Sequence, residues 1–162
     1  MKRLFLIRHA KSSWDDGALR DKDRPLNERG KRDAPKVGER LAKRRVKPDL
    51  ILSSPATRAL ATAEIIAKKL DYKRSRIVVD DRLYAVEADE LLDVIRQLDD
   101  GAECVLLIGH NPELTELAHR LFRKITHLPT CAVAKFTFDA KSWTGIGRDK
   151  PAKAALEYPG ES

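Results

Sequence analysis

The chain has 162 residues, of which 42% are hydrophobic and 35% are charged, and its formal net charge is +7. Such a composition is typical of one soluble globular domain, and it contains no apolar run near the ~20 residues that a membrane-spanning helix needs. The positive charge favours anionic partners such as phosphate esters, phosphoproteins or nucleic acid, without choosing among them.

The cysteines and the N-terminal residues indicate the compartment. Cys104 and Cys131 lie in apolar runs and lack the paired spacing of a zinc site, so we expect buried free thiols in a reducing compartment. Only the four apolar residues 4–7 precede Arg8, which is too few for the apolar region of a signal peptide. We therefore expect a cytoplasmic protein that does not act at a membrane.

Apolar runs that predict strands alternate along the chain with longer patterns that predict helices. The expected strands cover residues 3–8, 50–53, 76–79, 103–109, 130–138 and 142–147, the last two joined as a hairpin through 139–141. The expected helices cover residues 27–45, 54–70, 88–98 and 112–124. This alternation predicts a three-layer α/β/α sandwich with a mostly parallel mixed sheet. We expect one domain over residues 1–148, followed by an irregular polar tail over 149–162.

Three of the helices have recognisable start signals. Asn27 is the expected N-cap of the first helix. Ser54 and Asn111 are each followed directly by proline, which favours a capping residue with proline at the first helical position. These signals place the second and fourth helices immediately after the second and fourth strands.

Two arginines and two histidines lie where predicted strands end. Arg8 and His9 follow the first strand, Arg58 comes soon after the second, and His110 follows the fourth. In a parallel sheet these ends share one edge, where ligands gather in open α/β folds. Helix N-termini at the same edge suit a phosphate group.

Each of these residues also has an ordinary structural interpretation. An Arg-His pair after a strand is usually a solvated strand end, and His110 taken alone is a buried core histidine. Arg58, in contrast, lies early in its helix, where a positive charge opposes the helix dipole, and this position is easier to explain if it binds an anion. His119 and His127 have no such neighbours and keep the structural interpretation.

The segments that carry these residues match a known family in order along the chain. They are Leu6-Ile7-Arg8-His9-Ala10, Arg24-Pro25-Leu26 to Gly30, Ser53-Ser54-Pro55 with Arg58 and Thr62-Ala63-Glu64, and Ile108-Gly109-His110-Asn111. With these motifs the chain resembles the histidine phosphatase superfamily, which has the phosphoglycerate mutase-like fold. Within that superfamily it is most similar to the small SixA-type phosphohistidine phosphatases.

The resemblance implies that His9 becomes transiently phosphorylated and that Arg8, Arg58 and His110 bind the phosphoryl group. The chemistry agrees, because neighbouring guanidinium groups favour a neutral, nucleophilic imidazole and stabilise charge on the transferring oxygens. Ser12, at a position where the family has Thr, is expected to add a hydrogen bond to the phosphate or to structure its loop. Asn111 is expected to cap its helix first and to contact phosphate second. No metal cluster is recognisable, and we expect no cofactor.

Two departures from the family pattern bear on the substrate. Ala10 replaces the glycine of the Arg-His-Gly motif, which is a small change. Tyr84 falls where larger relatives carry a glutamate that protonates an alcohol leaving group, and Glu87 is close but displaced. An alkoxide needs a proton donor to leave, whereas imidazole, whose conjugate acid has a pKa of about 6.5, leaves without one. The missing acid therefore points to phosphohistidine.

Our hypothesis is a monomeric phosphohistidine phosphatase that acts through a phosphorylated His9 on a phosphorylated protein. By resemblance, that protein could be a histidine phosphotransfer domain. One alternative is a phosphatase of small phosphoesters or nucleotides with Glu87 as the acid. Another is a phosphate-binding or phosphoprotein-binding module without turnover. Nucleic-acid binding rests on the net charge alone, and no recognisable module supports it.

Overall fold

The computed structural model describes residues 1–159 and contains a six-stranded sheet in the order β3-β2-β4-β1-β5-β6. The strands are β1 (Lys2–Arg8), β2 (Leu50–Ser53), β3 (Val78–Val79), β4 (Cys104–Gly109), β5 (Val133–Phe138) and β6 (Lys153–Glu157). The first four are parallel to one another, whereas β5 is antiparallel to β1 and β6 is antiparallel to β5. The predicted mostly parallel mixed sheet is therefore confirmed.

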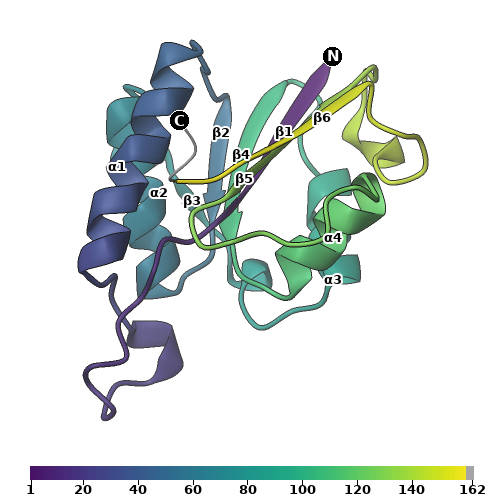
Figure 1. Cartoon of the computed structure of the whole chain (residues 1–162). Coiled ribbons are helices and arrows are strands. Elements are labelled where there is room, and N and C mark those ends of the chain that lie inside the picture. The colour runs from purple at the N-terminus through teal and green to yellow at the C-terminus, as the bar shows by residue number, and fades with distance from the viewer. Residues whose placement is uncertain (160–162) are drawn as a thin grey trace.

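Helices cover both faces of this sheet, which gives the three predicted layers (Figure 1). The helices α1 (Glu28–Lys43) and α2 (Thr57–Lys69) pack on one face, and α3 (Ala88–Arg96) and α4 (Glu113–Leu121) pack on the other. Short 3₁₀ turns complete the chain: η1 (Asp21–Asp23), η2 (Arg74–Arg76), η3 (Asp81–Leu83) and η4 (Trp143–Gly145). Among the described residues, no helix is long and apolar enough to cross a membrane.

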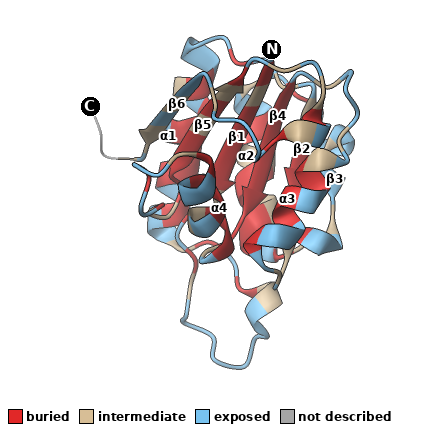
Figure 2. Cartoon of the chain, turned by 90° about the vertical axis from the view of Figure 1, so that its right-hand side faces the viewer, coloured by how far each residue is buried: buried red, intermediate tan, exposed pale blue. Residues whose placement is uncertain are grey.

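The central strand β1 is buried on both faces. Leu4 and Leu6 belong to the hydrophobic cluster under α3 and α4, whereas Phe5 and Ile7 belong to the cluster under α1 and α2. A strand between two helical layers reads as a continuous apolar run for this reason, and Figure 2 shows the central strands of the sheet in the colour of buried residues. The polar Arg8-His9 pair can therefore lie only where the strand leaves the core.

The predictions for the C-terminal region are partly wrong. Residues 142–147 form η4 and a turn rather than a strand, and no hairpin joins them to β5 within the described chain. Their apolar character comes from Trp143, which is fully buried and donates its indole N–H to the Ala102 carbonyl at 2.7 Å. The sixth strand is β6 instead, in the segment predicted to be an irregular tail. It has weak strand propensity, and its pairing with β5 decides its structure.

The start of α1 was predicted correctly, but the starts of α2 and α4 were not. The Asn27 side chain accepts a hydrogen bond from the Gly30 N–H at 2.9 Å, as an N-cap does. The N-cap of α2 is Ala56 and that of α4 is Pro112, so neither proline takes the first helical position. The Ser54 hydroxyl instead accepts from the Ala56 N–H and shapes the turn before α2.

Other boundaries differ from the predictions by at most three residues, within the usual uncertainty of helix and strand ends. The largest consequence is at the sheet edge, where the predicted strand 76–79 is reduced to Val78–Val79 because Arg76 belongs to η2. Residues 160–162 of the predicted tail lie outside the described residues.

The N-terminus of α1 is seated tightly against the chain that follows β1. The Asn27 N–H donates to the Lys11 carbonyl at 3.0 Å, and a Cβ on Gly30 would overlap the same carbonyl oxygen. We expect Gly30→Ala to lower the free energy of unfolding by about 1–3 kcal/mol through this overlap, as measured by denaturant titration.

Gly17→Ala is the matched control, because apart from its neighbours in the chain no described residue has an atom within 4 Å of the added Cβ. Equal stability of the Gly30 and Gly17 variants would show that the close approach of α1 is not a constraint on the fold.

Candidate active site

Two histidines lie side by side at the carboxyl end of the central strands. The parallel register pairs Arg8 with Gly109, so His9 and His110 follow β1 and β4 at the same level, and the His9 N–H donates to the Gly109 carbonyl at 3.0 Å. Their ring centroids are 5.0 Å apart, and the residues are only 7% and 6% exposed. The predicted convergence of these two strand ends is therefore present in the structure.

The His9 ring is held in one tautomer. Its Nδ1 lies 2.7 Å from the Ala10 carbonyl oxygen, which can only accept, so Nδ1 carries the proton and Nε2 keeps its lone pair. The Ala10 N–H in turn donates to the Thr62 hydroxyl at 3.0 Å, which fixes the backbone that orients the ring. His9 thus has the form that a nucleophilic imidazole requires.

The pKa of His9 is lowered to about 4, chiefly by burial and also by the charges of Arg58, Arg8 and Arg24, against the opposing effect of the Ala10 carbonyl. The pKa of His110 is lowered to about 3, first by burial and then by His9 and Arg58. Both imidazoles are therefore neutral at neutral pH.

Three guanidinium groups gather around these rings. Arg8 donates from Nη1 to the Leu128 carbonyl at 3.0 Å. The buried Arg58 donates to the Asp21 carbonyl at 2.6 Å and pairs with the Asp21 carboxylate at 3.0 Å. Arg24, also buried, pairs with the same carboxylate at 2.9 Å. Arg24 was missing from the site candidates, although it lies in one of the matched motifs. It was missed because its position in a basic, polar loop did not distinguish it from the other charged residues there.

Asp21 in η1 connects these arginines to Tyr84. The Tyr84 hydroxyl donates to the Asp21 carboxylate at 2.8 Å, and its ring meets His110 edge-on with centroids 5.5 Å apart. The Tyr84 hydrogen bond, together with Arg58 and Arg24, lowers the pKa of Asp21 to about 2. The resemblance aligned Tyr84 with the acid of larger relatives, but sequence reasoning assigned no role to Asp21, since an acidic residue in a charged loop carries no distinguishing signal.

The remaining candidates, Ser12 and Asn111, are bonded to the protein itself. The buried Ser12 hydroxyl accepts from Arg24. The Asn111 amide donates to the Leu128 carbonyl at 2.9 Å, and its oxygen accepts from the N–H and the hydroxyl of Thr115. Both side chains help to shape the site walls, and a direct phosphate contact from either stays a prediction.

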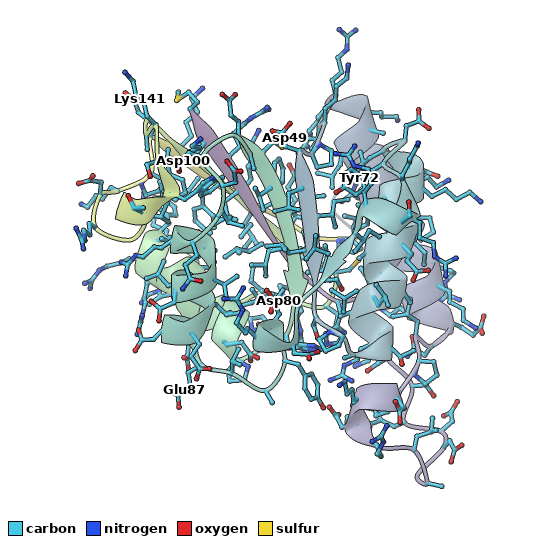
Figure 3. The ribbon with its side chains drawn as sticks, turned by 180° about the vertical axis from the view of Figure 1, so that it is seen from behind. Asp49, Tyr72, Asp80, Glu87, Asp100 and Lys141 are labelled. Atoms are coloured by element: carbon cyan, nitrogen blue, oxygen red, sulfur yellow. The ribbon has the colours of Figure 1, made fainter. Side chains whose placement is uncertain are left out.

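Glu87 lies outside this cluster. It is exposed and stands at the N-cap position of α3, and its side chain makes no capping hydrogen bond within the described chain. Figure 3 shows Glu87 at the same end of the sheet as Asp80, with its side chain turned outward.

Two buried nitrogens of the cluster are without partners. Within residues 1–159, the Arg8 Nε and the His110 Nδ1 are inaccessible to solvent and make no hydrogen bond. Buried polar atoms without partners are rare in folded proteins, and each calls for an explanation. Three cationic groups around them suit a tetrahedral anion such as phosphate. No group of three His, Cys, Asp or Glu side chains in this part of the chain is placed to hold a metal ion.

Comparisons with known proteins agree with this geometry. Residues 4–91 match the family model of the histidine phosphatase superfamily (branch 1), which leaves His110 outside the matched range. An uncharacterized chloroplastic protein of Arabidopsis thaliana is 34% identical over 150 residues, covering 88% of this chain and 69% of its own.

Solved structures show the same fold over nearly the whole chain. A protein assigned as phosphohistidine phosphatase SixA from Agrobacterium tumefaciens superposes with a TM-score of 0.80 at 28% identity, over 95% of this chain and 97% of its own. Another, from Nakamurella multipartitia, has a TM-score of 0.83 at 22% identity, over 99% and 97% of the two chains.

The lowered pKa values of the two histidines predict how stability depends on pH. Between about pH 6.5, where an unfolded histidine titrates, and about pH 4, the unfolded chain binds protons that the folded chain does not. The free energy of unfolding should therefore fall as the pH falls through this window, by up to about 1.4 kcal/mol per pH unit for each histidine.

Denaturant titrations at several pH values test this expectation. His9→Asn should weaken the fall because one of the two groups is gone, whereas His127→Asn, at an exposed position, should leave it unchanged. The same pH dependence in the wild type and the His9 variant would contradict the buried, neutral state of His9.

Proposed function

The chain belongs to the histidine phosphatase superfamily and is a phosphatase, and on that premise we propose that it hydrolyses phosphohistidine through a phosphorylated His9. The observation that carries the proposal is the state of His9. Its Nδ1–H is bonded to the Ala10 carbonyl, and its Nε2 has no hydrogen-bond partner within residues 1–159 and lies in a buried cluster that includes Arg8 and Arg58.

In the first step, Nε2 of neutral His9 attacks the phosphorus of the substrate. A P–N bond to His9 forms, the P–N bond to the substrate imidazole breaks, and the bonding electron pair leaves with that imidazole. The leaving group departs as neutral imidazole when its other ring nitrogen carries a proton. His9 keeps its Nδ1–H, so the phosphorylated ring is cationic and donates to the Ala10 carbonyl.

In the second step, water attacks the phosphorus of phosphorylated His9. A P–O bond forms, the P–N bond breaks, and its electron pair returns to Nε2. The proton lost by the water leaves with the phosphate product or passes to solvent. In both steps Arg8, Arg58 and His110 would bind the phosphoryl oxygens, where positioned donors stabilise the charge of the transition state.

The acid–base state of the site supports phosphohistidine over phosphoesters. The carboxylate that contacts Arg58 is Asp21, and with a pKa of about 2 it is ionised and has no proton to give. Tyr84, where larger relatives carry the acid, donates its proton to that carboxylate. An alkoxide leaving group needs a proton donor, whereas imidazole does not. The similarity to the Agrobacterium protein, at 28% identity, points the same way.

The proposal extends to phosphohistidine on a protein, such as a histidine phosphotransfer domain, with a monomer acting in the cytoplasm. Ser12 and Asn111 would contribute by holding Arg24 and the Leu128 segment in place, as their hydrogen bonds indicate.

Phosphate release from a phosphohistidine-bearing protein, compared with a sugar phosphate and an aryl phosphate, tests the substrate. We expect fast release from phosphohistidine alone, and His9→Ala should abolish it because the nucleophile is lost. Equal or faster turnover of the esters would contradict the substrate class. Absence of turnover with every substrate, and of any phosphorylated wild-type intermediate, would favour a phosphate-binding module.

Glu87→Gln tests the alternative in which a displaced acid serves esters. Because Glu87 is exposed and turned outward, we expect unchanged steady-state rates on phosphohistidine and on any ester that is slowly cleaved. Glu90→Gln, an exposed glutamate in the first turn of α3, is the matched control. A selective loss of ester turnover in the Glu87 variant would establish an ester phosphatase.

A further inference from the structure

His110 has one ring nitrogen with a partner and one without. Its Nε2 lies 2.7 Å from the hydroxyl oxygen of Ser54, whereas its Nδ1 is buried and makes no hydrogen bond within residues 1–159. Ser54 is itself fully buried. The chemical character of the unpartnered Nδ1, donor or acceptor, therefore depends on which of the two groups gives the proton in the His110–Ser54 bond.

The surroundings of Ser54 decide this question. A hydroxyl has one proton and two lone pairs. The Ser54 oxygen already accepts from the Ala56 N–H at 3.2 Å, and the described residues offer its proton no acceptor other than His110 Nε2. If Nε2 carried the proton instead, the oxygen would accept twice and the buried hydroxyl proton would be unpaired, which is unfavourable.

We propose that Ser54 donates to Nε2 of His110 and thereby fixes the tautomer in which Nδ1 carries the proton, so that the free buried nitrogen is a donor for a phosphoryl oxygen. Ser54 is then a positioning residue that acts through His110. The opposite tautomer would present a lone pair to the anion and repel it. The predicted effect on turnover rests on the proposed function, whereas the predicted tautomer of His110 does not.

Because the His110 ring is neutral, its single N–H lies on either Nδ1 or Nε2. The pKa of His110 is lowered to about 3, so the ring is neutral and only one of its nitrogens carries a proton. A cationic ring would offer a donor at both nitrogens whatever Ser54 did. In this site, Nδ1 is a donor only in the tautomer that the Ser54 hydroxyl favours.

The same tautomer serves opposite purposes in the two adjacent rings. In His9 the Nδ1–H is bonded to the Ala10 carbonyl and the Nε2 lone pair is free. In His110 the Nε2 lone pair accepts from Ser54 and the Nδ1–H is free. A backbone acceptor beside one ring and a hydroxyl donor beside the other thus distinguish the nucleophile from the oxyanion donor.

Long-range ¹H–¹⁵N correlation spectra of the full chain, labelled with ¹⁵N-histidine, measure the tautomers directly near neutral pH. The chain has four histidines, and His119→Gln, His127→Gln and His9→Asn assign their signals by loss. We expect His110 to show the chemical shifts of a protonated Nδ1 and an unprotonated Nε2. The reverse pattern in the wild type would overturn the proposal without any Ser54 variant.

Ser54→Ala tests the cause. Without the donor, His110 should shift towards the Nε2–H form, and kcat on phosphohistidine should fall about tenfold. This loss is smaller than the 10²–10³-fold cost of deleting one oxyanion donor, because part of the population keeps the active tautomer. Ser54→Cys, which retains a weak donor, should restore part of the Nδ1–H population of His110 and part of kcat.

Ser53→Ala is the matched control, because Ser53 is equally buried but donates to the Ser54 carbonyl rather than to His110. We expect it to keep the wild-type tautomer and turnover. An unchanged His110 spectrum in Ser54→Ala would overturn the proposal, as would equal losses of activity in the Ser53 and Ser54 variants. If the wild type released no phosphate from phosphohistidine, the proposed function would fail while the spectra still tested the tautomer.

Discussion

The register between β1 and β4 is the constraint on which the site depends. Because Arg8 lies opposite Gly109, the residues that follow, His9 and His110, leave the core at the same level and their rings meet. A slip of one residue would turn the apolar side chains of β1 towards the wrong helical layer, so the two hydrophobic clusters enforce the register. The packing of the core thus sets the distance between the two rings.

At this edge of the sheet, the loop before α1 supplies the negative charge that pairs with buried arginines. Arg24 and Arg58 are buried, and buried charges are costly unless they are paired. Asp21 from η1 pairs with both, and these ion pairs connect a loop with little regular structure to the site. In the proposed function the phosphoryl group would add the negative charge and the hydrogen-bond acceptors that residues 1–159 do not offer to Arg8 Nε and His110 Nδ1.

Sequence reasoning predicted the parts of this site that follow from periodicity. An apolar run such as residues 4–7 can be recognised as a buried strand, and its end locates Arg8 and His9 without further information. The same logic predicted the layers and the parallel centre of the sheet. It was wrong for 142–147 and for β6, where a buried tryptophan and an edge pairing outweigh local propensity.

The residues that sequence reasoning missed act through contacts distant in the chain. Asp21 meets Tyr84 across 63 positions and Arg58 across 37, and no local pattern distinguishes it from the other acidic residues of its loop. Ser54 was interpreted as a helix cap because a proline follows it, yet its hydroxyl contacts His110, 56 positions away. Side chains of this kind become visible only when the fold brings the strand ends together.

The direction of proton donation connects these contacts to the choice of leaving group. Tyr84 gives its proton to Asp21, and Asp21 is held ionised by that bond and by two arginines. The Asp21 carboxylate therefore has no proton to offer an alcohol, and the proton of Tyr84, which aligns with the acid of larger relatives, is directed to Asp21. Within residues 1–159, the buried nitrogens without a partner are Arg8 Nε and His110 Nδ1. In the proposed tautomer their N–H groups can stabilise charge on phosphoryl oxygens, but they are too weakly acidic to protonate an alkoxide leaving group. In the proposed function, this arrangement favours a substrate whose leaving group brings its own proton, as a protonated phosphoimidazole does.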